Sequence, residues 1–255
     1  MNLALPGAFL TAPLAHRGLH DVTRGIPENS RAAVSAAIAA GYGVEIDLQL
    51  SADGAAMVFH DYTLGRLTGR NGQVRHLPAA DLARLPLIGN GEGIATFADM
   101  LALVGGRAPL LVELKDQTGA MTPDTGRLEA AAAQALQGYT GPVALMSFNP
   151  HSVAALARLA PAIPRGLTTS CFHEPKMHLP EARRAELACI PDLGRVGAGF
   201  VSHRLADLDM DRIAEIKAAG QAILCWTVKS PADEAFARTV ADNITFEGYL
   251  PPLTA

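Results

Sequence analysis

Short apolar runs alternate with longer amphipathic stretches along almost the whole chain. The runs are near-continuous in aliphatic residues, which is typical of parallel strands buried on both faces. Strands are expected at residues 14–15, 43–50, 108–115, 143–148, 165–170, 198–203, 222–228 and 243–249. Between them, helices are expected at residues 31–40, 97–104, 124–136, from 150 onward, 180–189, 209–219 and 231–240. Eight strands with helices between them predict an α/β fold, a closed (β/α)8 TIM barrel.

The second strand carries charge on one face and is followed by a hairpin. Glu45 and Asp47 alternate with aliphatic residues, so both carboxylates are expected on the same face. Asp53-Gly54 is a dipeptide favoured in two-residue hairpin turns, and residues 56–59 are expected to form the returning strand. With that turn, opposed positions sum to 107, and His60 lies directly across from Asp47, with Cβ atoms about 4.5 to 5.5 Å apart. The pattern therefore predicts two acids and an imidazole in one pocket.

The chain as a whole is expected to form a single domain over residues 1–255, with one small insertion. Residues 62–93 are rich in Gly, Arg and Leu without long periodicity, and we expect them to form an excursion over the barrel mouth. The GNGEG segment at 89–93 is no dinucleotide fingerprint, because no strand precedes it. Ser30 and Thr96 stand where the N-caps of two of the helices belong.

Composition narrows the class of protein. A net charge of -4 and scattered basic residues argue against a nucleic-acid partner. Cys171, Cys189 and Cys225 are an odd number and far apart, which indicates a reducing compartment. The chain start has no Lys or Arg ahead of its short apolar part, and no apolar run approaches about 18 residues. We therefore expect a cytoplasmic protein without membrane insertion; nothing in the sequence fixes an oligomeric state.

Charged and aromatic residues are concentrated where predicted strands end. Those placed at or near a carboxyl end are His16, Arg17, Glu45, Asp47, His60, Glu113, Lys115 and Trp226. A barrel gathers all of its strand ends around one mouth, where barrel enzymes have their active sites. The sequence therefore predicts that these residues share one pocket.

The chemistry of these residues indicates phosphoester cleavage. The three carboxylates offer hard oxygen ligands without thiolates, a set that suits Mg²⁺ or Ca²⁺, with Mn²⁺ as a further candidate, better than zinc. Arg17 and Lys115 supply cations for a phosphate, while His16 and His60 can exchange protons at neutral pH. The expected reaction is metal-assisted, with one histidine deprotonating the nucleophile and the other protonating the leaving alkoxide.

Each of these residues also has a structural interpretation that the sequence leaves open. Arg17 is consistent with a salt bridge to Glu28, Lys115 with an ion pair to Glu113 or Asp116, and Trp226 with a place in the apolar core. Other polar residues have less clear positions. Asp61 is expected to orient a neighbour, His20 and His203 are within reach of the mouth, and surface positions are expected for His76, His151, His173 and His178.

Several segments together resemble one enzyme family. HRGLHDVTRGIPENS, VEIDLQLSADGAAMVFHD with the following TLGRLTG, VELK, SFNP and CWTV occur in the order and spacing of the glycerophosphodiester phosphodiesterases. The resemblance extends from about residue 15 to about residue 249. It implies a barrel, a divalent metal, and hydrolysis of small glycerophosphodiesters to sn-glycerol 3-phosphate and an alcohol. It also implies that the glycerol 2-hydroxyl attacks phosphorus and that water then opens a cyclic phosphate.

The resemblance implies a role for each residue that matches a family motif. The matches are His16 and His60 to the acid-base pair, Glu45, Asp47 and Glu113 to the metal ligands, Arg17 and Lys115 to the phosphate-contacting cations, and Trp226 to an aromatic residue near the substrate. The chain departs from the family pattern near its end. Glu247 is one methylene longer than the usual aspartate, so the residue that such an aspartate orients is expected to be shifted or lost. Lys229 replaces a common asparagine and is expected near the rim.

Two further functions remain alternatives. One is a lysophospholipase D-like enzyme or another phosphodiesterase that acts on phospholipid headgroups, and a long apolar lid over the mouth would favour it. The other is a barrel that binds phosphodiesters without catalysis, which the loss of a metal ligand or an imidazole would favour. All of these residues are present.

Overall fold

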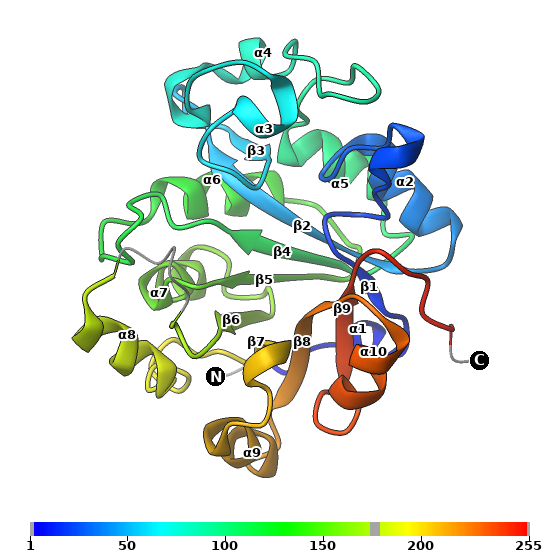
Figure 1. Ribbon diagram of the computed structural model, residues 1–255. Coiled ribbons are helices and arrows are strands. Elements are labelled where there is room, and N and C mark those ends of the chain that lie inside the picture. The colour runs from blue at the N-terminus through cyan, green and yellow to red at the C-terminus, as the bar shows by residue number, and fades with distance from the viewer. Residues whose placement is uncertain (1–2, 174–178, 254–255) are drawn as a thin grey trace.

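The computed structural model describes residues 3–173 and 179–253 and shows a closed barrel (Figure 1). Hydrogen bonding joins the strands in the order β1-β9-β8-β7-β6-β5-β4-β2, and a further β1–β2 pairing closes the ring. In the described part of the chain, eight parallel strands form it: β1 (Leu14–Ala15), β2 (Gly43–Leu50), β4 (Leu110–Leu114), β5 (Val143–Ser147), β6 (Arg165–Thr169), β7 (Phe200–Arg204), β8 (Ala222–Val228) and β9 (Asn243–Phe246). The predicted (β/α)8 barrel is confirmed.

Helices follow the strands and cover the outside of the barrel (Figure 1). The main ones are α2 (Arg31–Ala39), α5 (Phe97–Val104), α6 (Arg127–Ala135), α7 (Pro150–Leu159), α8 (Glu181–Ala188), α9 (Asp211–Ala218) and α10 (Pro231–Ala237). Ser30 caps α2 by accepting a hydrogen bond from the backbone N–H of Ala33, and Thr96 forms a capping box with Asp99 at α5. Both predicted N-caps are confirmed. Short 3-10 turns lie at Val22–Arg24, Val74–His76 and Leu205–Asp207.

A helix that the periodicity does not predict lies at the amino-terminal end of the barrel. This is α1 (Ala8–Thr11), whose Phe9 is fully buried with Leu14, Leu111 and Phe200. Asn243 on β9 secures it, because its side-chain amide donates to the carbonyl oxygens of Phe9 and Ala12, both at 2.7 Å. Phe9 and the apolar residues around it form a floor inside the barrel, at the end opposite the carboxyl ends of the strands.

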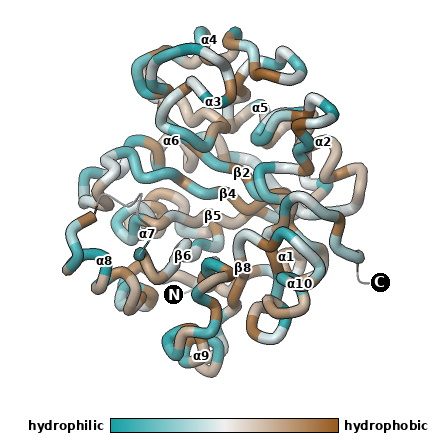
Figure 2. Tube along the Cα trace, in the orientation of Figure 1, coloured by the Kyte–Doolittle hydropathy of each residue, from teal (hydrophilic) through white to brown (hydrophobic). Residues whose placement is uncertain are grey.

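Alternation along each strand separates two apolar layers. On β4, Leu110, Val112 and Leu114 pack outward against the helices, whereas Leu111 belongs to the cluster inside the barrel. Glu113 therefore faces the interior, one step above Leu111. In Figure 2, β4 changes from brown to teal toward its carboxyl end. Apolar residues of β1, β4, β5, β7 and β8 thus form the floor, and polar residues nearer the carboxyl ends of the strands line the mouth.

The hairpin after β2 has a different register from the one expected. β3 (Ala56–Val58) pairs antiparallel with β2, and its partner positions, such as Leu48 with Val58, sum to 106 rather than 107. Asp47 therefore lies across from Phe59, whose N–H donates to the Asp47 carbonyl at 3.0 Å, and the predicted pairing with His60 is wrong. The cause is a turn of three residues, 52–54, in which Gly54 adopts a left-handed φ of 88°.

Residues 62–93 form a compact excursion beyond β3, drawn in cyan at the top of Figure 1. It contains α3 (Gly65–Thr68) and α4 (Ala79–Leu82). Most of its leucines pack inward, in a cluster with residues of the hairpin that includes Met57, Phe59 and Leu82. None of the helices within the described ranges is both long enough and apolar enough to span a lipid bilayer.

Candidate active site

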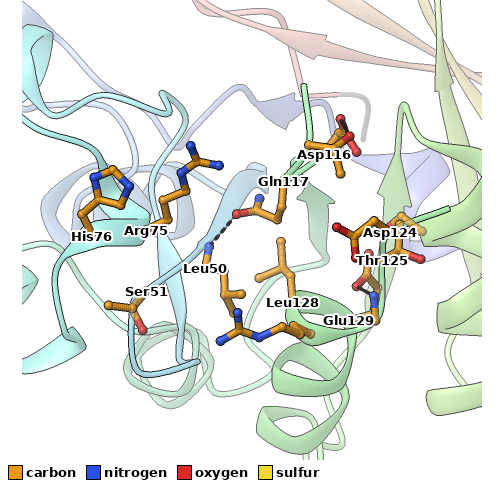
Figure 3. Close-up of a pocket in the computed structure, with 15 residues that line it drawn as sticks. Leu50, Ser51, Arg75, His76, Asp116, Gln117, Asp124, Thr125, Leu128 and Glu129 are labelled. Carbon is orange, nitrogen blue, oxygen red and sulfur yellow. Dashed lines mark hydrogen bonds between the residues drawn. The ribbon is translucent and has the colours of Figure 1, made fainter. Parts of the chain in front are cut away.

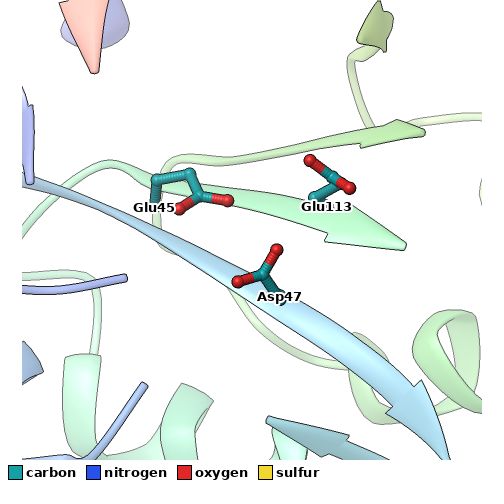
Figure 4. Close-up of side chains that lie close together, drawn as sticks. All are labelled: Glu45, Asp47 and Glu113. Atoms are coloured by element: carbon teal, nitrogen blue, oxygen red, sulfur yellow. The ribbon is translucent and has the colours of Figure 1, made fainter. Parts of the chain in front are cut away.

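Three carboxylates from two neighbouring strands converge inside the barrel mouth (Figure 4). Glu45 and Asp47 lie on β2, and Glu113 is the partner of Asp47 on β4. One carboxylate oxygen of each lies within 4.8 Å of the others, and all three residues are buried. Burial, together with the charges of Asp47 and Glu113, raises the pKa of Glu45 well above its ordinary value. Such a cluster is costly unless cations offset it.

Two cations offset part of this charge. Lys115 Nζ lies 2.6 Å from Glu113 Oε1 and 2.8 Å from Asp47 Oδ1, and Arg17 Nε lies 3.3 Å from Asp47 Oδ2. Burial opposes the charge on Lys115, but Asp47 and Glu113 outweigh it and hold its pKa above the ordinary value. Burial also disfavours the charge on Asp47, yet Lys115, His60 and Arg17 outweigh that effect and keep its pKa well below the usual range. Two cations do not fully offset three carboxylates; the raised pKa of Glu45 reflects this imbalance, which a bound metal ion would relieve.

The loop after β1 places Arg17 and a residue that the sequence did not identify. Arg17 and Asn29 both adopt left-handed φ angles, 55° and 57°. The backbone N–H of Arg17 donates to Glu45 Oε2 at 3.0 Å, and that of Asn29 donates to the Arg17 carbonyl at 2.8 Å. The Asn29 side chain donates to Asp47 Oδ2 at 2.9 Å and accepts from the Asp47 N–H at 3.1 Å. Asn29 thus orients Asp47; its only sequence signal is its place in the PENS segment before α2.

Each of the two mouth histidines is held at Nδ1 by a carboxylate. His16 Nδ1 lies 2.5 Å from Glu247 Oε2, and His60 Nδ1 lies 2.7 Å from Asp61 Oδ1. An Nδ1–H that donates to a carboxylate leaves Nε2 as the ring atom available for proton exchange. Burial lowers the pKa of His16, although its bond to Glu247 acts in the opposite direction. Asp61 orients its neighbour, as expected.

Glu247 reaches His16 despite its difference from the family pattern. Its other oxygen, Oε1, lies 2.6 Å from Lys229 Nζ, which places Lys229 at the rim as expected. His20 Nε2 lies 3.7 Å from Glu247 Oε2 and so also lies near the mouth. The pKa of Glu247 is held well below its ordinary value, chiefly by its bond to His16. Of the two expected outcomes, a shift or a loss of the oriented residue, the loss is wrong, because the longer side chain still reaches the imidazole.

The mouth contains a cavity of about 670 Å³ that is lined by both charged and apolar side chains. Its lining includes His16, Arg17, Glu45, His60, Glu113, Lys115 and Trp226. Met146, Phe148 and Trp226 supply apolar parts of the lining, and the Phe148 and Trp226 rings meet edge to face with centroids 5.5 Å apart. Trp226 Nε1 donates to the Ser202 carbonyl at 3.0 Å, which fixes the indole. The structure thus brings the predicted strand-end residues together, with Asp47 among them through the carboxylate cluster.

The ion pairs that the sequence left open as structural roles for Arg17 and Lys115 are present in part. Arg17 does pair with Glu28, at 2.7 Å, while it also lines the cavity. Lys115 pairs with Glu113, but its second partner is Asp47 rather than Asp116.

The remaining histidines lie elsewhere. His203 does not line the cavity: it is fully buried, between the Thr169 hydroxyl and the Asp207 carbonyl. His76 and His173 are exposed, as expected, and His151 is half-buried at the start of α7. His178 lies outside the described residues.

A second, smaller pocket of about 250 Å³ lies beside the hairpin and the start of α6 (Figure 3). Its polar groups are engaged in local structure. Gln117 Oε1 accepts from the Leu50 N–H, Glu129 caps α6 at Gly126, and Asp116 accepts from Asn149. None of the predicted site residues lines this pocket, so the chemistry is concentrated at the barrel mouth.

Comparison with known proteins agrees with this geometry. The model of the glycerophosphoryl diester phosphodiesterase family matches residues 16–243. A glycerophosphodiester phosphodiesterase of Caldanaerobacter subterraneus is 30% identical over 170 residues, which cover 63% of this chain and 68% of the relative.

Two solved structures have similar folds. A phosphodiesterase of Oleispira antarctica, in complex with the product sn-glycerol-3-phosphate, has a TM-score of 0.76 at 25% identity, with 94% of each chain covered. A putative glycerophosphoryl diester phosphodiesterase of Silicibacter pomeroyi has a TM-score of 0.75 at 24% identity, with 92% of this chain and 89% of that chain covered. The chain therefore belongs to the glycerophosphoryl diester phosphodiesterase family and is a phosphoric diester hydrolase.

Proposed function

We propose that this protein is a metal-dependent enzyme that hydrolyses glycerophosphodiesters to sn-glycerol 3-phosphate and an alcohol. The observation that carries the proposal is the buried cluster of Glu45, Asp47 and Glu113, which lies at the same mouth as two imidazoles held by carboxylates. The Oleispira antarctica relative, described in complex with sn-glycerol-3-phosphate, supports the identity of the product. The widely spaced cysteines support a cytoplasmic location.

The metal site would be built from Glu45, Asp47 and Glu113. Their donors are all carboxylate oxygens, a set that suits Mg²⁺ or Ca²⁺, with Mn²⁺ as a further candidate. A bound cation would supply a Lewis acid for a non-bridging phosphoryl oxygen. Asn29 orients Asp47 through two hydrogen bonds, and the Arg17 N–H orients Glu45.

The substrate would lie in this cavity and contact both its charged and its apolar lining residues. Arg17 and Lys115 supply charged N–H groups for the phosphoryl oxygens, Arg17 as a planar fork and Lys115 as a point charge. Trp226 and Phe148 provide an apolar surface for the carbon skeleton of the substrate. The phosphorus is then held close to both imidazoles.

Proton transfer would be shared between the two histidines. A lowered pKa keeps His16 neutral at pH 7, so that its Nε2 can accept the proton of the attacking glycerol 2-hydroxyl. His60 would donate its Nε2 proton to the leaving alkoxide. Opening of the resulting cyclic phosphate by water uses the same atoms in reverse, with His60 as base and His16 as acid, and returns both residues to their starting state.

A chelator experiment tests the metal requirement. Release of glycerol 3-phosphate from glycerophosphocholine should stop in chelator and return with Mg²⁺, Mn²⁺ or Ca²⁺. Glu45→Gln should lose activity at all metal concentrations, whereas Glu215→Gln, an exposed change on α9, should behave as wild type. Full activity in chelator would eliminate the proposal.

A long apolar lid over the mouth would favour the lipid-headgroup alternative. The leucines of residues 62–93 are largely committed to their own buried cluster and do not provide one. The same assay with a lysophospholipid as substrate is expected to give a much lower kcat/KM than with glycerophosphocholine.

A further inference from the structure

The TLGRLTG segment places an arginine between two carboxylates. Arg66 lies on α3, and its guanidinium donates to Asp61 from Nε at 2.7 Å and from Nη2 at 2.9 Å. It also donates to Glu28 from Nη1 and from Nη2, both at 2.7 Å. Arg66 therefore holds two carboxylates at once, each through a pair of hydrogen bonds, which is the geometry that a planar guanidinium favours.

Each of these carboxylates has a second partner at the barrel mouth. Asp61 Oδ1 lies 2.7 Å from His60 Nδ1, and Glu28 Oε1 accepts from Arg17 Nη1 at 2.7 Å. Arg66 is thus connected to His60, the proposed acid-base residue, through Asp61. It is connected to Arg17, the proposed phosphate-binding residue, through Glu28. It joins two separate loops, one after β1 and one after β3.

A lysine could not replace this arrangement. A lysine ammonium is a compact point charge and cannot pair two donors with each of two carboxylates in one plane. The arrangement also differs from an ordinary surface ion pair of the same excursion. Arg84 has a side chain that is 79% exposed and approaches one carboxylate, Asp81, at 3.7 Å.

The charges of this network are stable near neutral pH. The two hydrogen bonds that Arg66 donates to Glu28 and the two that it donates to Asp61 raise the pKa of Arg66 above its ordinary value. Burial would raise the pKa of Glu28, but its bonds to Arg66 and the charge of Arg17 outweigh that effect and lower it. The contacts of Arg66 with Glu28 therefore persist near neutral pH.

We propose that Arg66 is a positioning residue, which fixes His60 through Asp61 and Arg17 through Glu28 in the geometry that the reaction needs. The excursion of residues 62–93 thereby contributes to catalysis through α3 without contacting the substrate. The inference rests on the proposed roles of His60 and Arg17.

Kinetics of Arg66→Ala and Arg66→Lys test it, with Arg84→Ala as the matched control. Arg66→Ala should lower kcat by roughly 10- to 100-fold, the cost of misplacing a catalytic group by about 1 Å, and should raise KM several-fold through Arg17. Arg66→Lys should resemble Arg66→Ala in kcat, because a positive charge alone does not restore the paired hydrogen bonds to Glu28 and Asp61. Arg84→Ala should match wild type. The Arg66 side chain is 47% exposed, so the melting temperature should change little in both Arg66 variants.

Chemical rescue separates positioning from a merely structural role. Free guanidinium can reach a half-exposed site, and at millimolar concentration it should restore part of the kcat of Arg66→Ala but none of that of His60→Ala. Wild-type kcat and KM in Arg66→Ala, or full activity in Arg66→Lys, would overturn the inference. So would a loss that follows the melting temperature and shows no rescue. An unchanged rate in His60→Ala would instead refute the proposed function.

Discussion

A buried histidine away from the active site makes stability depend on pH in a calculable way. His203 on β7 is fully buried; its Nε2 donates to the Asp207 carbonyl and its Nδ1 accepts from the Thr169 hydroxyl. Both ring nitrogens are therefore engaged by the neutral form. Burial lowers the pKa of His203 from 6.5 to about 4, although Asp207 acts in the opposite direction.

The size of the effect follows from the difference between these two values. Because the folded-state pKa is the lower one, the unfolded chain takes up a proton below pH 6.5 while the native state does not. Stability is then undiminished above pH 6.5 and is lost as the pH falls toward 4. The difference between 6.5 and about 4, at about 1.4 kcal/mol for each unit of pKa, gives a loss of about 3.5 kcal/mol below both values and of about 3 kcal/mol at pH 4, where the native state is itself half protonated.

The His203→Gln variant isolates this contribution. An amide side chain can donate to the same carbonyl but does not titrate. Free energies of unfolding would be measured by urea titration at pH 7.5 and pH 4 for both proteins, in chelator so that metal binding contributes equally. The difference between wild type and variant should shift by about 3 kcal/mol in favour of the variant at pH 4. A difference that does not change with pH would show that the burial of His203 is not what depresses its proton affinity.

Three further predictions concern the mouth. His16→Ala and His60→Ala should each lower kcat by about 10² to 10⁴, as expected for a positioned acid or base, and an unchanged rate in either would remove that residue from the mechanism. Lys115→Ala should raise KM and lower kcat, measured by steady-state kinetics, because a phosphate contact is lost; wild-type kinetics would assign that lysine a structural role. Glu247→Gln should lower kcat at least about tenfold, since a charge-assisted hydrogen bond is worth about 1.5 to 3 kcal/mol. Glu247 raises the pKa of His16, so removing its charge should move the acid limb of kcat/KM to lower pH, and a limb that stays in place would contradict the orienting role.

Much of the fold could be predicted because strand and helix periods are local properties. Apolar runs separated by capped helices identified the barrel, and Ser30 and Thr96 are N-caps as expected. Helix α1 was missed because four residues carry too little periodic signal. The hairpin register was wrong by one, since Asp53-Gly54 is compatible with turns of two or three residues and only pairing distinguishes them.

The residues of the site likewise fall into those that the sequence predicted and those that it did not. The sequence placed Glu45, Asp47 and Glu113 at strand ends, and parallel strands in a barrel bring such ends together. The sequence did not indicate the contacts of Asn29, Glu247 and Arg66, whose side chains reach across loops to partners on other elements.

By itself, the sequence determined that the charged side chains at the strand ends meet at one mouth, because side-chain alternation along a strand and the common direction of parallel strands are set locally. Only the tertiary structure decided how those side chains are oriented. Orientation depends on left-handed turns such as that at Arg17 and on hydrogen bonds between residues as far apart as His16 and Glu247. These contacts are defined by the closed barrel, since no local pattern specifies which loops will face each other.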